Sequence, residues 1–283
     1  MEFSLKITSF RKILTIVCDW GEEIVLRMGK DCIWLQVLYE SIAILQIDLE
    51  LDKLIQYKLP KEDFFFSFDI KTLEKAIKFA DIDSTLTIVC EEESKLVWLK
   101  LINAEKDKKV EICLPENNPE PHGFLISTKY ITSVNILTKE FKQIVQNLSL
   151  FHEDIDIEYT TKNQLIFIGT NDTCNIIFTL NESVRKPSAL RLKCSSGKLI
   201  SASGVDNRKV RDFMVAKKCR ITLDLRYLVK IINSIENLRH KPSYIKSLVY
   251  NEEYPFQLEF EIPDVAIIKY FIAVKVPEKE NTD

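Results

Sequence analysis

Residues that support enzyme chemistry are few in this sequence, and their spacing does not favour catalysis. None of the three histidines lies at metal-ligand spacing from a cysteine. The segment Cys194-Ser-Ser-Gly197 matches no signature of a catalytic nucleophile. The acidic pairs Asp81 with Asp83 and Asp154 with Asp156 follow predicted helices, where carboxylates more often cap turns than bind a metal. We therefore predict that the protein is not an enzyme and uses no cofactor.

Lysine and arginine are the side chains whose pattern points to binding. Four segments, at residues 9–19, 69–80, 138–148 and 224–234, place apolar residues on one helical face and basic residues on the opposite face. Exposed lysines are common on soluble helices, but four basic faces in a chain of net charge −3 indicate one shared polyanion. The candidate residues for this contact are Arg11, Lys12, Lys71, Lys75, Lys78, Lys142, Arg226 and Lys230.

A second concentration of positive charge lies between Arg185 and Arg220. Eleven Lys and Arg residues there accompany only Asp206 and Asp212, a local balance of +9 that leaves −12 for the rest of the chain. The Ser and Gly content favours a mobile loop, either in contact with a polyanion or simply solvated. The side chains expected to be exposed are Lys193, Lys198, Arg208, Lys209 and Arg211.

The elements that position these side chains occur twice along the chain. The matching segments are Phe10–Val17 with Phe141–Leu148, Lys30–Leu35 with Lys162–Phe167, and Asp69–Leu73 with Asp224–Leu228. Their offsets are 131, 132 and 155 residues, so the second copy carries 23 extra residues. This spacing predicts the duplication of one domain rather than a repeat of short period.

A proline-rich strap separates the two copies. Residues 111–124 contain three prolines and a glycine, which exclude a continuous helix. Between the predicted helices, short runs such as 23–27, 32–36 and 42–49 are typical of antiparallel strands. We predict an α+β fold of two tandem similar domains. Their expected bounds are 1–114 for the first domain, 115–127 for the strap and 128–283 for the second domain, with the basic insertion at about 185–218.

Two further features bear on the class of protein. No uninterrupted apolar run approaches the length of a membrane span, and the first residues lack the pattern of a secretory leader. The seven cysteines are odd in number and include no Cys-x-x-Cys pair. We therefore expect reduced thiols, no membrane contact, and a place in the cytosol or nucleus.

Three passages, taken with the duplication and the strap, carry a resemblance to one known family. They are Leu35-Gln36 followed by Ile44–Leu49, then Leu223–Leu228, and Pro255–Ile262 leading to Ile268–Lys275. In order and spacing they resemble sliding clamps of the proliferating cell nuclear antigen family. The resemblance extends along the whole chain, and none of the three passages is a catalytic motif.

The resemblance implies a ring-shaped polymerase processivity factor made of three identical subunits. Short helices would line a channel around double-stranded DNA, with the eight basic residues named above facing it, and antiparallel sheets would lie outside. DNA polymerase and repair enzymes would dock through short hydrophobic motifs beneath the strap, and a clamp loader would open the ring. The implied location is the nucleus, or the replication site of a virus if the chain is viral. The implied docking groove consists of Leu38, Tyr39, Pro255, Phe271, Ile272 and Ala273.

We expect the ring to close by strand pairing between neighbouring subunits. Val110–Leu114 and Asn175–Leu180 are apolar and end the strand series of their domains, so each is expected to be an exposed edge. Pairing one with the other is head-to-tail, which closes a ring when the rotation divides a full turn. The interface candidates are Val110, Ile112, Leu114, Ile176, Ile177 and Phe178.

Two departures from the family pattern indicate a divergent member. Gln143 and Gln146 stand where the third channel helix of the family usually carries arginines, and the basic insertion replaces a loop that is typically acidic. Two alternatives remain open. One is a subunit of a heterotrimeric checkpoint-type clamp, and the other is a monomeric DNA-binding processivity factor.

Overall fold

The computed structural model describes residues 1–275 apart from 59, 61, 92–95, 107, 116–129, 182–189, 195–198, 203–209 and 252–253. The described residues form a few helices and strands that pair mainly antiparallel, in two compact units. The first unit comprises Met1–Phe124, Ser234–His240 and Glu261–Lys269, and the second comprises the rest. Apart from Pro115, the predicted strap lies outside the described residues. No helix in the described part of the chain has the length and apolar character needed to cross a membrane.

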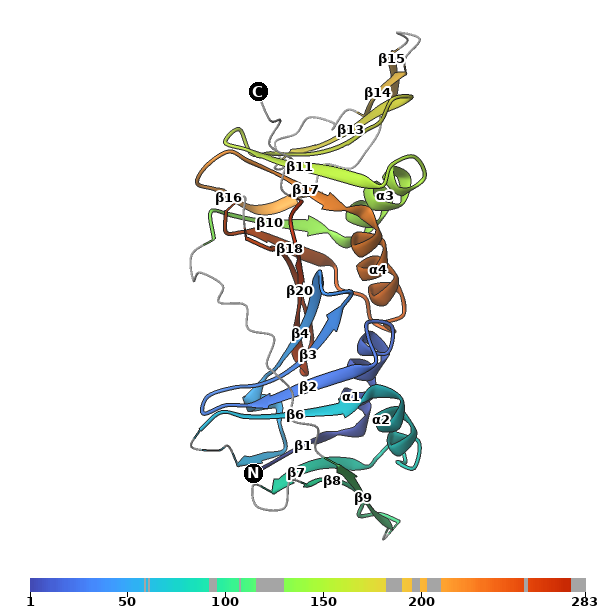
Figure 1. The fold of residues 1–283 in the computed structure, drawn as a ribbon, viewed down its shortest axis with the longest axis vertical. Coiled ribbons are helices and arrows are strands. Elements are labelled where there is room, and N and C mark those ends of the chain that lie inside the picture. The colour runs from blue at the N-terminus through green and yellow to red at the C-terminus, as the bar shows by residue number, and fades with distance from the viewer. Residues whose placement is uncertain are drawn as a thin grey trace, which may run out of the picture. The chain divides into compact units, whose positions relative to one another are not determined.

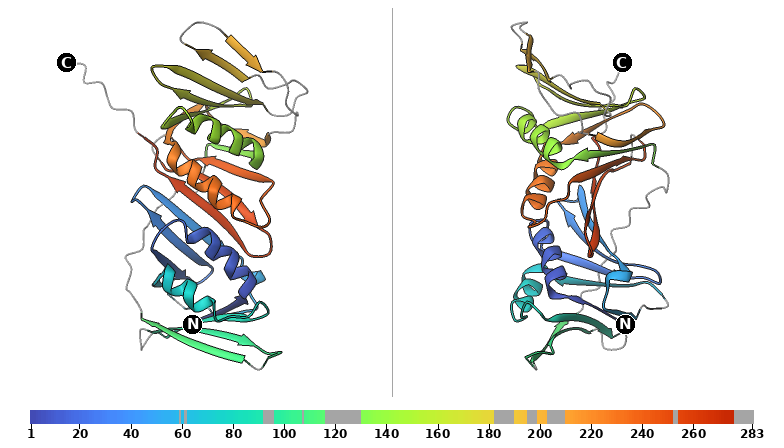
Figure 2. Two further views of the ribbon diagram at one scale, coloured as in Figure 1. Left: turned by 90° about the vertical axis from the view of Figure 1, so that its right-hand side faces the viewer. Right: turned by 180° about the vertical axis from the view of Figure 1, so that it is seen from behind.

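The first unit places two helices side by side on the same side of its strands (Figures 1 and 2). One sheet has the strand order β5-β1-β7-β8-β9, and another runs β6-β2-β3-β4 with the start of β20 beyond β4. The elements are β1 (Glu2–Lys6), α1 (Ile7–Val17), β2 (Glu23–Met28), β3 (Ile33–Tyr39), β4 (Ala43–Leu49), η1 (Leu51–Lys53), β5 (Gln56–Lys58), β6 (Phe64–Asp69), α2 (Ile70–Ile77), β7 (Thr85–Glu91), β8 (Leu96–Asn103) and β9 (Lys108–Pro115).

The second unit repeats this plan with its own two helices (Figure 2). One sheet runs β15-β14-β13-β12-β11-β17, and the other runs β16-β10-β18-β19-β20. The elements are β10 (Thr132–Leu137), α3 (Thr138–Ser149), β11 (Asp154–Thr160), β12 (Gln164–Thr170), β13 (Cys174–Asn181), β14 (Leu190–Cys194), β15 (Leu199–Ala202), β16 (Val210–Val215), β17 (Cys219–Asp224), α4 (Leu225–Glu236), β18 (Tyr244–Val249), β19 (Phe256–Ile262) and β20 (Ala266–Ile272). The end of α4 and the turn between β19 and β20 belong to the first unit.

The helices form where the sequence places apolar residues three and four positions apart. In α1, Phe10, Ile13, Leu14 and Val17 are buried, and each such side chain contributes about 1.5–3 kcal/mol by leaving water. Asp69 caps the start of α2, because its carboxylate accepts a hydrogen bond of 2.6 Å from the backbone N–H of Thr72. All four predicted helices are present within a few residues of their expected bounds.

The order of elements shows a fourfold repeat of one motif. A strand, a helix and three strands recur as β1-α1-β2-β3-β4, β6-α2-β7-β8-β9, β10-α3-β11-β12-β13 and β17-α4-β18-β19-β20. The additional elements η1 and β5 interrupt the first unit, and β14, β15 and β16 interrupt the second at the corresponding place.

Within each unit the two motifs exchange strands. In the first unit β1 pairs with β7, and β6 pairs with β2. In the second unit β10 pairs with β18, and β17 pairs with β11. The leading strand of each motif therefore completes the sheet of the other motif, and the two helices of a unit come from equivalent positions.

The basic insertion differs from the sequence expectation. We expected a mobile loop, but its described residues form strands β14, β15 and β16. Backbone pairs Cys174↔Cys194 through Phe178↔Leu190 join β14 to β13, and Leu190↔Ala202 through Lys193↔Leu199 join β15 to β14. Lys193 thus belongs to a strand, and so does Arg211 in β16. Lys198, Arg208 and Lys209 lie outside the described residues.

Candidate nucleic-acid interface

The basic side chains of α1 and α2 form the first part of the candidate interface. Lys71 and Lys75 are exposed, and Lys12 is half-buried. The ammonium of Lys71 lies 4.0 Å from a Glu22 carboxylate oxygen, and that of Lys78 lies 3.3 Å from Glu74. Exposed pairs of this kind contribute at most about 1 kcal/mol. An incoming phosphate can therefore replace these carboxylates at little cost.

Arg11 has a structural role that sequence reasoning missed. Its Nη2 donates hydrogen bonds to the carbonyl oxygens of Ala80, at 2.9 Å, and of Ile77, at 3.4 Å. Cations are favoured at this position because the last carbonyls of a helix carry partial negative charge. The side chain predicted to contact DNA is therefore engaged by helix carbonyls in this structure. It ties α1 to the C-terminal end of α2.

Two helices of the second unit supply the remaining predicted contacts. Lys142 on α3 and Lys230 on α4 are half-buried, and Arg226 at the start of α4 is exposed. Asp224 accepts hydrogen bonds from the Arg226 backbone N–H at 2.8 Å, from Nε at 3.1 Å and from Nη2 at 2.9 Å. Burial raises the pKa of the Asp224 carboxyl, but the bonds from Arg226 outweigh it and hold that pKa below the usual range. Arg226 therefore carries a neutralised charge, which weakens its candidacy as a phosphate contact.

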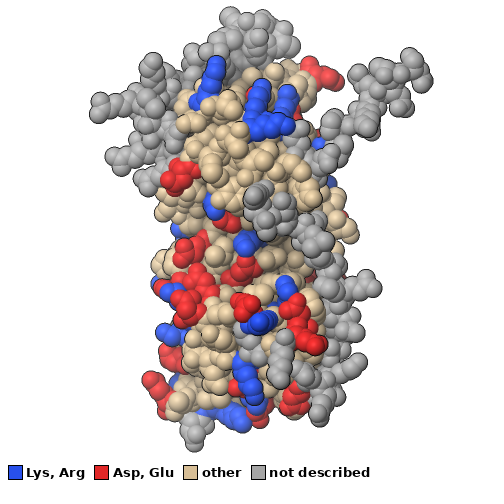
Figure 3. Space-filling model, turned by 90° about the vertical axis from the view of Figure 1, so that its left-hand side faces the viewer, with Lys and Arg blue, Asp and Glu red and all other residues tan. Residues whose placement is uncertain are grey.

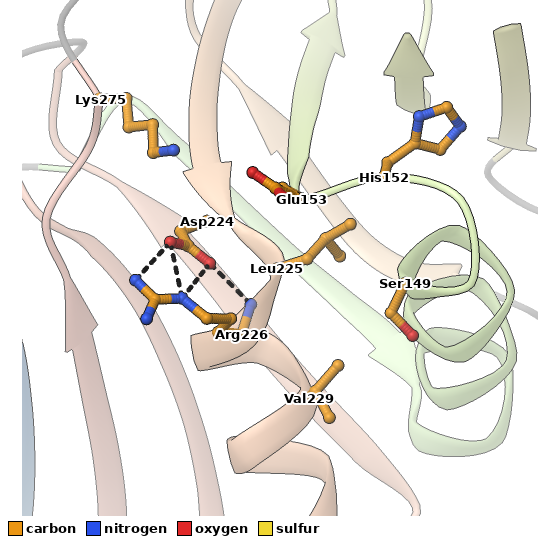
Figure 4. A pocket seen from close by; sticks show the side chains of 8 residues that line it. All are labelled: Ser149, His152, Glu153, Asp224, Leu225, Arg226, Val229 and Lys275. Carbon is orange, nitrogen blue, oxygen red and sulfur yellow. Dashed lines mark hydrogen bonds and ion pairs between the residues drawn. The ribbon is translucent and has the colours of Figure 1, made fainter. Parts of the chain in front are cut away.

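A cleft in the second unit opens beside this ion pair. It has a volume of about 880 Å³ and is lined by Ser149, His152, Glu153, Asp224, Leu225, Arg226, Val229 and Lys275. Figure 4 shows the Arg226 guanidinium turned toward Asp224, while the ring of His152 points away from that pair. Lys275 in turn pairs with Asp154. Since both cations already face carboxylates, the cleft has little attraction for an anion.

The charge on the helices contrasts with that of the rest of the chain. The four helical sequences contain eight Lys or Arg and three Glu, in a chain whose net charge is −3. On the face drawn in Figure 3, acidic and basic side chains are interspersed. Gln143 and Gln146 are exposed on α3. The excess of basic over acidic residues makes the helices suited to contact with phosphate.

The predicted docking groove is only partly available at the surface. Leu38 and Tyr39 on β3 of the first unit are half-buried, and the Tyr39 ring packs edge-on against Trp20 with centroids 5.8 Å apart. In the second unit Pro255 is half-buried and Ala273 is exposed. The other two predicted residues, Phe271 and Ile272, are core side chains, with 4% and 0% of their surface exposed. Their assignment to an open groove is wrong, because both side chains at the end of β20 are packed inside.

The two strands expected to join subunits differ in their availability. β9 is the outer strand of its sheet, with Val110 and Ile112 half-buried and Leu114 buried. β13 is not an edge, because β12 pairs with one side and β14 with the other. The expectation of a free edge at Ile176, Ile177 and Phe178 is therefore wrong. Sequence reasoning treated the insertion as a loop and so left that edge uncovered.

Four large apolar side chains are exposed at the ends of helices, and sequence reasoning did not single them out. The pair Phe79 and Ile82 follows α2, and the pair Leu150 and Phe151 follows α3, where Leu150 is 74% exposed. Lys108 Nζ donates to the Phe79 carbonyl at 3.0 Å, and Asn171 Nδ2 donates to the Phe151 carbonyl at 2.7 Å. The sequence did contain a signal for these side chains, because apolar residues continue past the last turn of each of the two helices.

Among the described residues, no cluster of three His, Cys, Asp or Glu side chains has the arrangement of a metal site. The candidate interface described above consists of basic side chains on the helices and of exposed apolar side chains at their ends. No model of a known protein family matches this sequence.

Proposed function

We propose that the protein is a DNA sliding clamp, a processivity factor that holds replication and repair enzymes on double-stranded DNA. The observation that carries the proposal is the fourfold strand-helix-strand motif, in which every copy presents a helix with two basic residues. Four equivalent helices with excess positive charge suit a long regular polyanion better than a compact ligand. The resemblance to sliding clamps described above supports the same conclusion.

The proposed mechanism is attraction to the phosphate backbone without reading of the bases. Contacts to phosphates carry no sequence information, which suits a protein that must move along DNA. The exposed pairs of Lys71 with Glu22 and of Lys78 with Glu74 can exchange their carboxylates for phosphates. No chemical step is required, since a topological tether works by preventing diffusion away from the template.

Partner proteins form part of the same proposal. DNA polymerase and other enzymes would dock through short hydrophobic motifs, as the resemblance implies, and a clamp loader would place the protein on DNA. Leu38, Tyr39, Pro255 and Ala273 keep exposed surface for such contacts. The nucleus, or a viral replication site, is the proposed location.

The test removes three charges from the helices of the first unit. Changing Lys12, Lys71 and Lys75 together to alanine should lower the slope of log affinity against log salt by up to about three units, because each phosphate contact releases about one counterion. Fluorescence anisotropy with duplex DNA across a salt series measures this slope. Each single alanine should have little effect.

A matched control removes the same charge elsewhere. Lys30, Lys58 and Lys162 are exposed and lie outside the helices, so their triple alanine variant should keep the original salt slope. Equal slopes for the two triple variants would show that the helices are not the DNA-binding surface, and the proposed function would have to be abandoned.

The covered edge of β13 favours a second candidate, in which identical copies do not form a ring. The protein would then act as a monomeric DNA-binding processivity factor or as a subunit of a heterotrimeric clamp. Light scattering at micromolar concentration separates these cases, because the chain mass is 33.0 kDa. The second candidate predicts a single-chain mass while β13 stays covered. A mass three times larger in the purified protein would instead support the homotrimer.

A further inference from the structure

The pairing of β13 with β14 brings two cysteines to directly opposed positions. Cys174 begins β13, Cys194 ends β14, and the two are paired residues in the antiparallel ladder. Opposed residues of antiparallel strands have Cα atoms about 4.5 or 5.5 Å apart. Both separations fall within the range of about 4.4–6.8 Å found for disulfides. The backbone register thus provides the spacing for a cross-strand disulfide.

One polar side chain lies against the sulfur of Cys174. Cys174 is a half-buried free thiol, and its Sγ lies 3.7 Å from Nε2 of His152. His152 is buried, and its Nδ1 has no hydrogen-bond partner among the described residues. Gly169 leaves room for the imidazole ring, because a Cβ at that position would lie 2.3 Å from its Cδ2. Burial lowers the pKa of His152, which favours the neutral form of its ring.

We propose that Cys174 and Cys194 form a reversible disulfide that fastens β14 to the edge of β13. The oxidant is a low-molecular-weight disulfide. The Cys174 thiolate attacks one of its sulfurs, which breaks the sulfur–sulfur bond and releases one small thiol. The Cys194 thiolate then attacks the Cys174 sulfur of the mixed disulfide and releases the second small thiol. The two cysteines lose two electrons, the oxidant gains them, and the two cysteine protons end on the released thiols.

The consequence for assembly rests on the proposed function. Five residue pairs hold β14 against β13, and while they persist no strand of another molecule can pair there. The disulfide would hold β14 against β13 until a reductant cleaves the sulfur–sulfur bond. The outer strand then left is β15, which has four residues against the eight of β13. Short edge strands are a known protection against unwanted pairing.

The disulfide can be mapped without any assumption about DNA. After incubation with oxidised glutathione, peptide mapping without reduction should give one linked species that joins the Cys174 and Cys194 peptides. The Cys194→Ser variant should instead carry glutathione on Cys174. The controls Cys18→Ser and Cys113→Ser, which remove exposed thiols, should leave the linked species unchanged. If Cys174 and Cys194 instead remain separate thiols or glutathione adducts, the proposal is wrong.

A second measurement tests what the disulfide does. Hydrogen exchange at the amides of β13 should slow by at least about tenfold in the oxidised protein, because cross-linking restricts local opening of the strand. The oxidised Cys174→Ser variant should exchange like the reduced protein. A mapped disulfide with no change in exchange would overturn its role as a fastener. The salt-slope experiment with the triple lysine variant tests the proposed clamp function and not the disulfide. A negative result in one experiment is therefore distinguishable from a negative result in the other.

Discussion

The Trp20→Ala variant is expected to lose about 3–5 kcal/mol of unfolding free energy, the usual cost of truncating a buried tryptophan. Trp20 is fully buried, and its Nε1 donates a 2.8 Å hydrogen bond to Ser234 Oγ, which is also buried. Its ring also packs edge-on against Tyr39. The substitution therefore leaves a cavity in the first unit and removes the indole hydrogen bond to Ser234. Urea denaturation measures the loss of unfolding free energy, with far-ultraviolet circular dichroism as the signal because it does not depend on the removed tryptophan.

Two variants separate packing from hydrogen bonding at this position. Trp20→Phe retains most of the apolar volume but removes the donor, and it should cost less than Trp20→Ala, with about 0.5–1.5 kcal/mol from the lost hydrogen bond. Trp98, a half-buried tryptophan of β8, provides the control, since its change to alanine should cost less than Trp20→Ala. If Trp20→Ala and Trp98→Ala lower the unfolding free energy equally, the burial and hydrogen bond of the Trp20 indole add no stability beyond that of a half-buried tryptophan.

The Gly169→Ala variant is expected to cost about 1–3 kcal/mol of stability through overpacking. A Cβ at residue 169 would lie 2.3 Å from Cδ2 and 2.8 Å from Cγ of the His152 ring. These are ring atoms of a buried side chain, so the imidazole as a whole must move. The second unit should then unfold at lower denaturant concentration than in the unaltered protein.

A double-mutant cycle shows whether the ring is the cause. With His152→Ala already present, adding Gly169→Ala should cost almost nothing further, because the space is free. The control is Gly29→Ala, whose Cβ would lie 2.9 Å from the flexible end of Asp63, and this change should be milder. Additive costs for Gly169 and His152 would contradict the packing argument.

The sequence was sufficient for the repeated parts of the fold. Helices appeared where apolar residues recur at helical spacing, as in Phe141, Ile144, Val145 and Leu148 of α3. The matching offsets along the chain predicted a duplication, and the order of elements repeats accordingly. Periodicity works for these segments because each buries one continuous face.

Three features of the candidate site could not be predicted from the sequence pattern. Ser, Gly and charge indicated a loop where the chain forms β14, because strand pairing depends on a neighbour that local sequence does not reveal. Arg11 lies on the polar side of its helix, but its long side chain reaches the carbonyls of α2. Phe271 and Ile272 were assigned from the resemblance alone, and two consecutive buried residues break the alternation expected of a strand with one exposed face.

The exchange of strands between motifs has a consequence for how the chain comes to be folded during synthesis. Strand β1 finds its partner β7 only after more than 80 residues have followed it, as in the pair Glu2↔Val89. The first unit also requires Ser234–His240 and Glu261–Lys269, which are made more than 100 residues after Phe124. A ribosome adding about 5–20 residues per second therefore exposes Trp20 for many seconds before Ser234 exists. Long-range pairing of this kind also slows folding. We therefore expect the apolar residues of the incomplete first unit to need protection by a chaperone during synthesis.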